Sequence, residues 1–244
     1  MFRRCRAASQ VALFIGFAAL ALGAAAGSLQ VNPVRVELRN GATSGAVVVR
    51  NDGAETVVVQ TSILAWTQAD GKDVYSPTRE ALATPPVATI PPGGEQIVRV
   101  GLRRPPDPKR EVAFRLYVQE IPGPPQPGFQ GLQVALRIGL PVFVDPLTAV
   151  TRDLEWGAAR AADGKIKVMV RNRGNVHLQV YDIALRADGA EPVAGESQLT
   201  YILAGETREW LLPIDGTLPV SVPMLRLTAF TDAGEINASV RLDP

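Results

Sequence analysis

The side chains that most often carry chemistry are scarce in this chain of 244 residues. It contains one histidine, His177, and one cysteine, Cys5. Zinc and copper sites need three or four ligands, so a lone histidine is most often a surface or turn residue. A serine nucleophile needs a histidine base, and no Gly-x-Ser-x-Gly motif accompanies His177. A carboxylate pair stays open, but no spacing points to one. The sequence therefore predicts no enzyme, no cofactor and no metal.

Ligand contact through aromatic or basic residues has little more support. We expect Trp66, Trp156 and Trp210 to be core or sheet-face residues, with sugar stacking as the alternative. Glycine-rich stretches precede strand-like runs, so they lack the helix N-terminus of a phosphate site. The chain has 25 basic and 24 acidic residues, a net charge of +1. This balance predicts no nucleic-acid partner and no anionic membrane surface.

The first residues are typical of a secretory signal peptide. Three arginines come first, residues 11–22 form a short apolar run, and three alanines at 24–26 offer a cleavage site. A membrane anchor is the alternative, but a run of about a dozen residues is too short for a bilayer of ~30 Å. We expect residues 1–26 to be removed and the mature protein to be exported. Cys5 leaves with the signal, so disulfides contribute nothing to the mature chain.

The elements that would position any site are β-strands. Apolar residues alternate with polar ones, as in half-buried strands, and Asn-, Asp-, Pro- and Gly-rich turns separate the runs. The alternating sets are Val34, Val36, Leu38; Val98, Val100, Leu102; Val112, Phe114, Leu116, Val118; Ile166, Val168, Val170; and Ile236, Ala238, Val240, Leu242. No stretch after the signal holds a helical period for three turns. The pattern predicts an all-β protein built from sandwiches.

A domain boundary is expected close to residues 145–148. This segment follows the longest apolar strand, and each side then has roughly a hundred residues, the usual size of an immunoglobulin-like sandwich. We therefore predict one domain at residues 27–147 and a second at 148–244, joined at an angle like a boomerang. A single long barrel is the alternative.

Four segments, in this order along the chain, resemble those of the PapD-like pilus-assembly chaperones. They are an opening strand with one arginine at residues 31–36, a Pro-Pro-Val and Pro-Gly segment at 84–100, a Glu-Ile-Pro-like segment at 114–122, and a long alternating strand at 132–146. The turn at residues 172–175 is similar to the asparagine-bearing turn of the family's second domain. The resemblance covers nearly all of the mature chain. Pro141 indicates a divergent branch of the family, of the archaic or alternative type.

The resemblance implies donor-strand complementation. The chaperone lends a strand to a pilin subunit that lacks one, caps it, and delivers it to an outer-membrane usher. The residues implied for the subunit groove share one face of the last strand of the first domain: Leu132, Val134, Leu136, Ile138 and Leu140. Pattern alone leaves open an ordinary core strand. Self-association that caps the free donor strand is a further partner to expect.

The resemblance also implies a basic site for the subunit's terminal carboxylate, between the domains. Arg35 matches the family's arginine of the first strand. The family's lysine matches Pro141, which has neither charge nor N–H. Arg137 and Arg115 are the candidates to replace it, because they lie on the polar parity of adjacent strands.

Two other classes of function remain open at this point. A secreted β-sandwich adhesin or carbohydrate-binding module would explain the signal and the fold, and would bind glycans through a tryptophan. A secreted enzyme on the same fold would need a site that the sequence does not contain.

Overall fold

The computed structural model describes residues 29–123, 134–161, 164–187, 191–214, 218 and 222–243, and these residues form strands and turns with no α-helix. The strands of the first half are β1 (Leu29–Asn32), β2 (Val36–Leu38), β3 (Ser44–Asn51), β4 (Val57–Ala69), β5 (Lys72–Pro77), β6 (Ala81–Thr84), β7 (Val87–Ile90), β8 (Glu95–Leu102), β9 (Val112–Ile121) and β10 (Arg137–Val144). Those of the second half are β11 (Leu154–Arg160), β12 (Lys165–Asn172), β13 (Leu178–Arg186), β14 (Ala194–Glu196), β15 (Thr200–Ile202), β16 (Thr207–Pro213), β17 (Met224–Thr231) and β18 (Gly234–Asp243).

The first half is a sandwich of two sheets. One sheet has the order β1-β3-β8-β6, and the other has the order β2-β10-β9-β4-β5 with β7 on β4. Val49, Val98, Leu116 and Val142 are fully buried between them. These residues share the inward parity of their strands, as alternation requires when one face of each sheet is buried.

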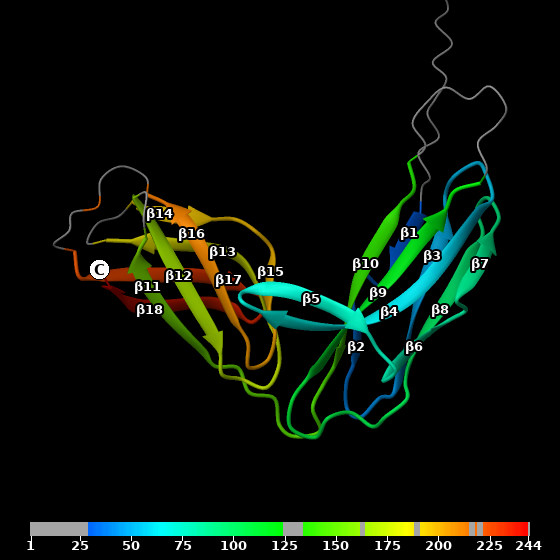
Figure 1. The fold of residues 1–244 in the computed structure, drawn as a ribbon, viewed down its shortest axis with the longest axis horizontal. Helices are drawn as coiled ribbons and strands as arrows, with labels where there is room; N and C mark the ends of the chain where they lie inside the picture. The colour runs from blue at the N-terminus through cyan, green and yellow to red at the C-terminus, as the bar shows by residue number, and fades with distance from the viewer. Residues whose placement is uncertain are drawn as a thin grey trace, which may run out of the picture.

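The second half encloses a core of its own. Its strands follow the order β14-β13-β17-β18-β11-β12-β16, with β15 on β13, and the parallel pair β11–β18 joins the two layers. Buried and exposed residues alternate along all of β12, which confirms the predicted alternation of Ile166, Val168 and Val170. Figure 1 shows the two immunoglobulin-like bodies meeting at an angle. The boundary predicted at residue 147 lies in the segment between β10 and β11 and stays a prediction.

Two buried asparagines hold equivalent turns in the two domains. The side-chain amides of Asn51 and Asn172 each donate to the carbonyl four residues later and to a distant main-chain carbonyl. Each Oδ1 accepts the N–H two residues later. Both residues are fully buried, so these bonds satisfy amides that would otherwise be costly in a core. The asparagine turn expected at residues 172–175 is thus one of a matched pair.

The hairpin β4–β5 extends from the first domain to the second (Figure 1). Asp70 and Gly71 at its tip both have positive φ, as a tight hairpin turn requires. Arg208 of β16 donates through Nη1 to the Gly71 carbonyl at 2.7 Å. The hairpin is therefore a strut between the two sandwiches.

Candidate functional site

The stretch that runs from residue 134 to the end of β10 at Val144 has two parts with different surroundings. Its lower half, residues 140–144, belongs to the core: Leu140 is 3% exposed, and Val142 and Phe143 are fully buried. In the upper segment, residues 134–139, Val134 is 67% exposed, and Leu136 and Ile138 are half-buried. Leu132 lies outside the described residues. Of the five predicted groove residues, Leu140 thus packs inside its own domain, and Val134, Leu136 and Ile138 have surface left for a partner.

One edge of the upper segment is free. β9 pairs with β10 along its whole length, from Arg137 to Val144. On the other side, β2 pairs with Val142–Val144 in parallel, and no other strand among the described ranges pairs there. An unpaired strand edge is a template for the addition of another strand.

Glu120 of β9 holds the top of this segment in place. Its N–H donates to the Leu136 carbonyl at 2.8 Å, and its Oε2 accepts the Leu136 N–H at 3.3 Å. Leu136 is therefore hydrogen-bonded to β9 as a strand residue would be, although β10 itself begins one residue later, at Arg137. The Glu-Ile-Pro-like segment of the sequence supplies this carboxylate.

Arg35 lies where the first domain faces the second, but it is not within a strand. The opening strand expected at residues 31–36 is split: β1 ends at Asn32 in one sheet, and β2 begins at Val36 in the other. Pro33 lacks an N–H and cannot continue a ladder, so the chain changes sheets there. The expected alternation beginning at Val34 is therefore wrong, and Val34 is 72% exposed.

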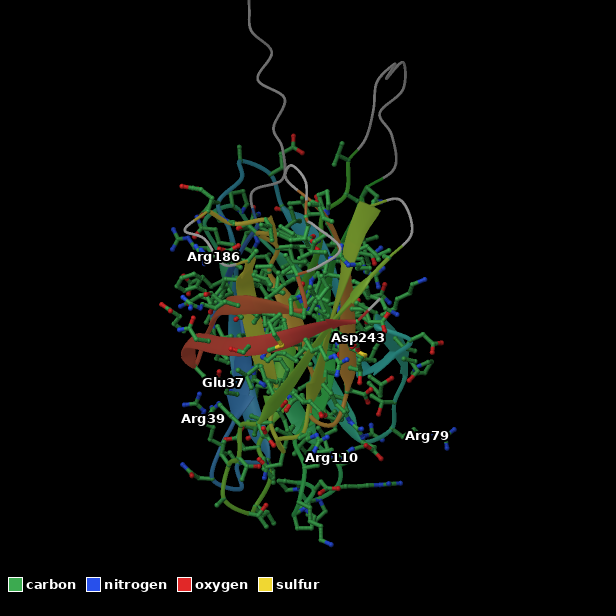
Figure 2. The ribbon with its side chains drawn as sticks, turned by 90° about the vertical axis from the view of Figure 1, so that its left-hand side faces the viewer. Glu37, Arg39, Arg79, Arg110, Arg186 and Asp243 are labelled. Atoms are coloured by element: carbon green, nitrogen blue, oxygen red, sulfur yellow. The ribbon has the colours of Figure 1, made fainter. Side chains whose placement is uncertain are left out.

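Acidic side chains already surround Arg35. Its Nε is 2.8 Å from a Glu37 oxygen and its Nη1 is 3.9 Å from Asp232 of the second domain. Glu37 also pairs with Arg39, and the two lie beside each other in Figure 2. A cavity of about 370 Å³ opens here, lined by three arginines and four carboxylates. This cavity by itself therefore has no excess of positive charge with which to attract an anion.

Arg115 and Arg137 project from the face of β9 and β10 opposite to the core, as their parity predicted. The Arg115 guanidinium lies 5.4 Å from the centre of the Trp66 ring, and that of Arg137 lies 4.0 Å from the centre of Tyr117. Both geometries are those of cation–π contacts. No carboxylate in the described part of the chain forms an ion pair with either guanidinium.

The hydroxyl of Tyr201 in β15 is influenced by two of these arginines, Arg35 and Arg115. Burial raises the pKa of its hydroxyl, while the positive charges of Arg35 and Arg115 act in the opposite direction. Tyr75 of β5 lies near as well: burial and Asp73 raise its pKa, and Arg115 lowers it. Arg35, between β1 and β2, and Arg115 of β9 therefore act on the same phenol, while Arg137 lies farther along the sheet.

The domain joint was not predicted from the sequence. His177, expected at a surface or turn, has a side chain only 10% exposed, and its Nδ1 lies 2.8 Å from Glu111 of the first domain. Its ring stacks on Phe143 with centroids 3.5 Å apart. The amide of Gln68 donates to the Tyr201 carbonyl and accepts the Leu203 N–H. These contacts fix the two domains against each other at the foot of β10.

The tryptophans and the acidic groups offer no other site. Trp66 is 3% exposed and Trp210 is 7% exposed, as expected of core residues, and the half-buried Trp156 stacks on Trp210. Across the described ranges, no group of three or more His, Cys, Asp or Glu could hold a metal ion. The described residues also include no helix with the length and hydropathy of a membrane span.

Comparisons with known proteins point to one family. Residues 28–149 match the model of the pili and flagellar-assembly chaperone, PapD N-terminal domain. No curated protein sequence matches the chain. Among solved structures, the chain is similar to one of the CsuC–CsuE chaperone–tip adhesion subunit complex from archaic Csu pili of Acinetobacter baumannii, with 20% identity, a TM-score of 0.65, and coverage of 89% of this chain and 100% of that one.

Two further structures show the same likeness. The E. coli chaperone DraB is 22% identical with a TM-score of 0.60, over 88% of this chain and 97% of that one. A structure of the Salmonella enterica SafA pilin with the SafB chaperone gives 18% identity and a TM-score of 0.59, over 87% and 96%. At these identities the structural matches show the fold, and the match to the domain model shows the family.

Proposed function

The chain belongs to the PapD-like family of pilus-assembly chaperones, and from this premise we propose that it holds a pilin-like subunit by donor-strand complementation on the upper segment of β10. It is a chaperone in pilus assembly, with pilin subunits as its partners. The observation that carries the proposed mechanism is the free edge of β10 beside the exposed Val134. Chaperone–pilin pairing is a known instance of strand addition, in which main-chain bonds give affinity and alternate side chains fill pockets.

The groove residues in this proposal are Leu132, Val134, Leu136 and Ile138. Burial of each large apolar side chain in a partner is worth about 1.5–3 kcal/mol relative to exposure. Leu140 contributes indirectly, because its place in the core anchors the strand from which the others project.

We propose Arg115 as the main anchor for the subunit's terminal carboxylate, with Arg35 beside it. Arg115 lies over the Trp66 ring and has no acidic partner among the described residues, whereas Arg35 already pairs with Glu37. A charge-assisted hydrogen bond to a guanidinium is worth roughly 1.5–3 kcal/mol net. Arg137 lies over Tyr117, farther from Tyr201, and is a weaker candidate.

The remaining features of the proposal concern processing and partners. Residues 1–26 act as a signal peptide, residues 27–147 and 148–244 are the two domains, and the mature protein works in the periplasm. It passes its subunit to an outer-membrane usher, and self-association caps the free donor strand. It carries out no catalysis. Pro141 favours a divergent branch of the family. The adhesin or carbohydrate-binding alternative is not favoured, because the family is one of assembly chaperones and two of the three indole rings, those of Trp66 and Trp210, are buried.

The test is recovery of a subunit from the periplasm. The full chain with a carboxy-terminal affinity tag should be exported, lose residues 1–26 by intact mass, and co-purify with one pilin-like protein in a stoichiometric complex. Deletion of the chaperone should remove that protein from the periplasm, because an unfilled groove aggregates or is degraded. A chaperone that purifies alone when the pilin is present would contradict the proposal.

A further inference from the structure

A second cavity, of about 400 Å³, opens between the two domains and is called the arginine cavity below. Its lining consists of Arg110 from the first domain and Arg171, Asn172, Arg173, Gly174 and Gly205 from the second. Over the residues that the structure describes, this lining contains three arginines and no carboxylate. The cavity around Arg35 has four carboxylates beside its three arginines. The arginine cavity, unlike that one, therefore has an excess of positive charge.

The fold fixes Arg110 at the boundary between the domains. Asp107 Oδ1 accepts the N–H groups two and three residues later, at 2.7 and 2.9 Å, and these bonds hold the pKa of Asp107 below its ordinary value. The N–H of the next residue, Glu111, donates across the boundary to the Asn175 carbonyl at 2.9 Å. The Arg110 guanidinium lies against Gly205, where a Cβ would be only 2.9 Å from its Cζ. Gly205 also has a φ of +80°, so a side chain is disfavoured there on both grounds.

The second domain holds its two arginines beside the same glycine. Arg171 and Arg173 are exposed on either side of the buried Asn172. The Asn172 carbonyl accepts the Gly205 N–H at 3.0 Å, and its own N–H donates to the carbonyl of the following residue at 2.9 Å. These bonds tie the turn that carries Arg171 to the turn on which Arg110 lies. Because the Gly205 N–H is already bonded, the guanidiniums are the donors left for a ligand.

Two of the three guanidiniums have no counter-charge. Arg173 Nε donates to Glu155 at 2.7 Å, whereas no ion pair joins Arg110 or Arg171 to a carboxylate anywhere in the described ranges. Like charges around one cavity repel each other, and an anion between them removes that repulsion. The planar fork of a guanidinium matches two oxygens of a phosphate. A phosphate monoester carries about −1.5 to −2 charges at pH 7, which matches two unpaired guanidiniums.

We propose that the arginine cavity binds a phosphate group, which bridges Arg110 of the first domain and Arg171 of the second. The bound phosphate neutralises both guanidiniums and stabilises the contact between the domains, beside the bond from Glu111 to Asn175. Phosphate binding at this place goes beyond the proposed donor-strand function and is independent of it, since no described residue of β10 lines the cavity.

Calorimetric titration of the purified, tagged protein with inorganic phosphate, at an ionic strength held constant with sodium chloride, should show one site. Arg110→Gln and Arg171→Gln should each weaken phosphate binding about tenfold or more, as loss of a charge-assisted bond implies. Glu155→Gln, which releases Arg173 from its ion pair, should strengthen binding. Arg226→Gln is the matched control, because it removes the same charge from an exposed position of β17 and should leave the affinity unchanged.

Hydrogen exchange tests the bridge between the domains. Saturating phosphate should slow exchange of the Glu111 amide, which donates across the boundary, and Arg110→Gln should remove this protection. Phosphate binding that leaves the Glu111 amide unprotected would overturn the bridge.

Phosphatidylcholine vesicles that contain phosphatidic acid distinguish the two sources of a phosphate group. Flotation of the protein with these vesicles, lost in Arg171→Gln, assigns the site to a lipid headgroup. Titration by inorganic phosphate without such flotation assigns it to a soluble phosphate. Absence of binding to both probes, or binding that Arg110→Gln and Arg171→Gln both retain, overturns the proposal, whatever the protein does with a pilin subunit.

Discussion

The lower half of β10 and its upper segment have the same alternation of apolar residues but different neighbours. Leu140 and Val142 fill the core between two sheets, and β2 covers the edge from Val142 onward. Leu136 is bonded to β9 on one side only, and both Val134 and Leu136 keep exposed surface. A free apolar edge is an aggregation hazard that soluble proteins usually cover. Its presence here, continuous with a well-packed strand, is what the proposed donor-strand function requires.

The largest expected effect is on subunit binding through the upper segment. Changing both Val134 and Leu136 to Ser removes two apolar side chains from the groove, a loss of about 3–6 kcal/mol of binding free energy. Recovery of the subunit from the periplasm should fall below detection, as measured by co-purification with the tagged chaperone.

The same double variant should melt close to the parent as a free protein, because these side chains contribute little to its own core. A fall of many degrees in Tm would mean that the upper segment is part of the core and that the contrast with the lower half is wrong.

The next effect is on stability through the lower half. Leu140→Ala should lower the free energy of unfolding by about 2–5 kcal/mol, since the cavity lies between two packed sheets. Urea unfolding of the purified protein measures this change. Val134→Ala is the control on the same face of the same strand, and its effect should stay within about 0.5 kcal/mol. Similar losses for both variants would erase the distinction.

The sequence predicts the sandwiches well because alternation is a local property. Each strand with one buried face shows it, as β12 and β18 do. The same property cannot tell which end of β10 is free, since Leu140 and Val134 have equal parity whether a partner or the domain itself covers them. That difference depends on β2, which arrives from residues 36–38, about a hundred positions away in sequence.

The contacts between the domains could not be predicted from local sequence patterns either, because they also depend on residues distant in the chain. Glu111 and His177, and Gln68 and Tyr201, are far apart in the chain and meet only when the two sandwiches do. The break at Arg35 could have been found, because Pro33 within a supposed strand is a signal that the strand does not continue. The choice of Arg115 over Arg137 depends on side-chain direction, which parity alone does not give.

A smaller effect on subunit binding is expected from the proposed carboxylate anchor, Arg115 and Arg35, at the lower end of the upper segment. Arg115→Gln should weaken subunit binding by about 1.5–3 kcal/mol, because a neutral amide cannot replace the charge-assisted bond. Arg35→Ala should weaken it about tenfold, near 1.4 kcal/mol. Arg137→Gln is the matched control and should change binding less than either. Recovery of the subunit with each tagged variant, relative to the parent, measures all three, and a larger loss for Arg137→Gln would move the anchor up the strand.

The smallest effect concerns how the upper segment is held ready without a partner. Glu120 Oε2 accepts the Leu136 N–H, so Glu120→Ala removes that acceptor. The main-chain N–H of residue 120 still donates to the Leu136 carbonyl in the variant. One partly buried hydrogen bond is worth about 0.5–1.5 kcal/mol, and its loss should raise amide exchange at Leu136 by roughly two- to tenfold. Global stability should hardly change, since the bond lies outside the core, and amides of the lower half should exchange as in the parent. Subunit binding should weaken slightly, because a looser segment loses more conformational entropy when it is captured. Faster exchange throughout β10 would show instead that its two halves open as one unit. The two halves would then differ in exposure but not in local stability.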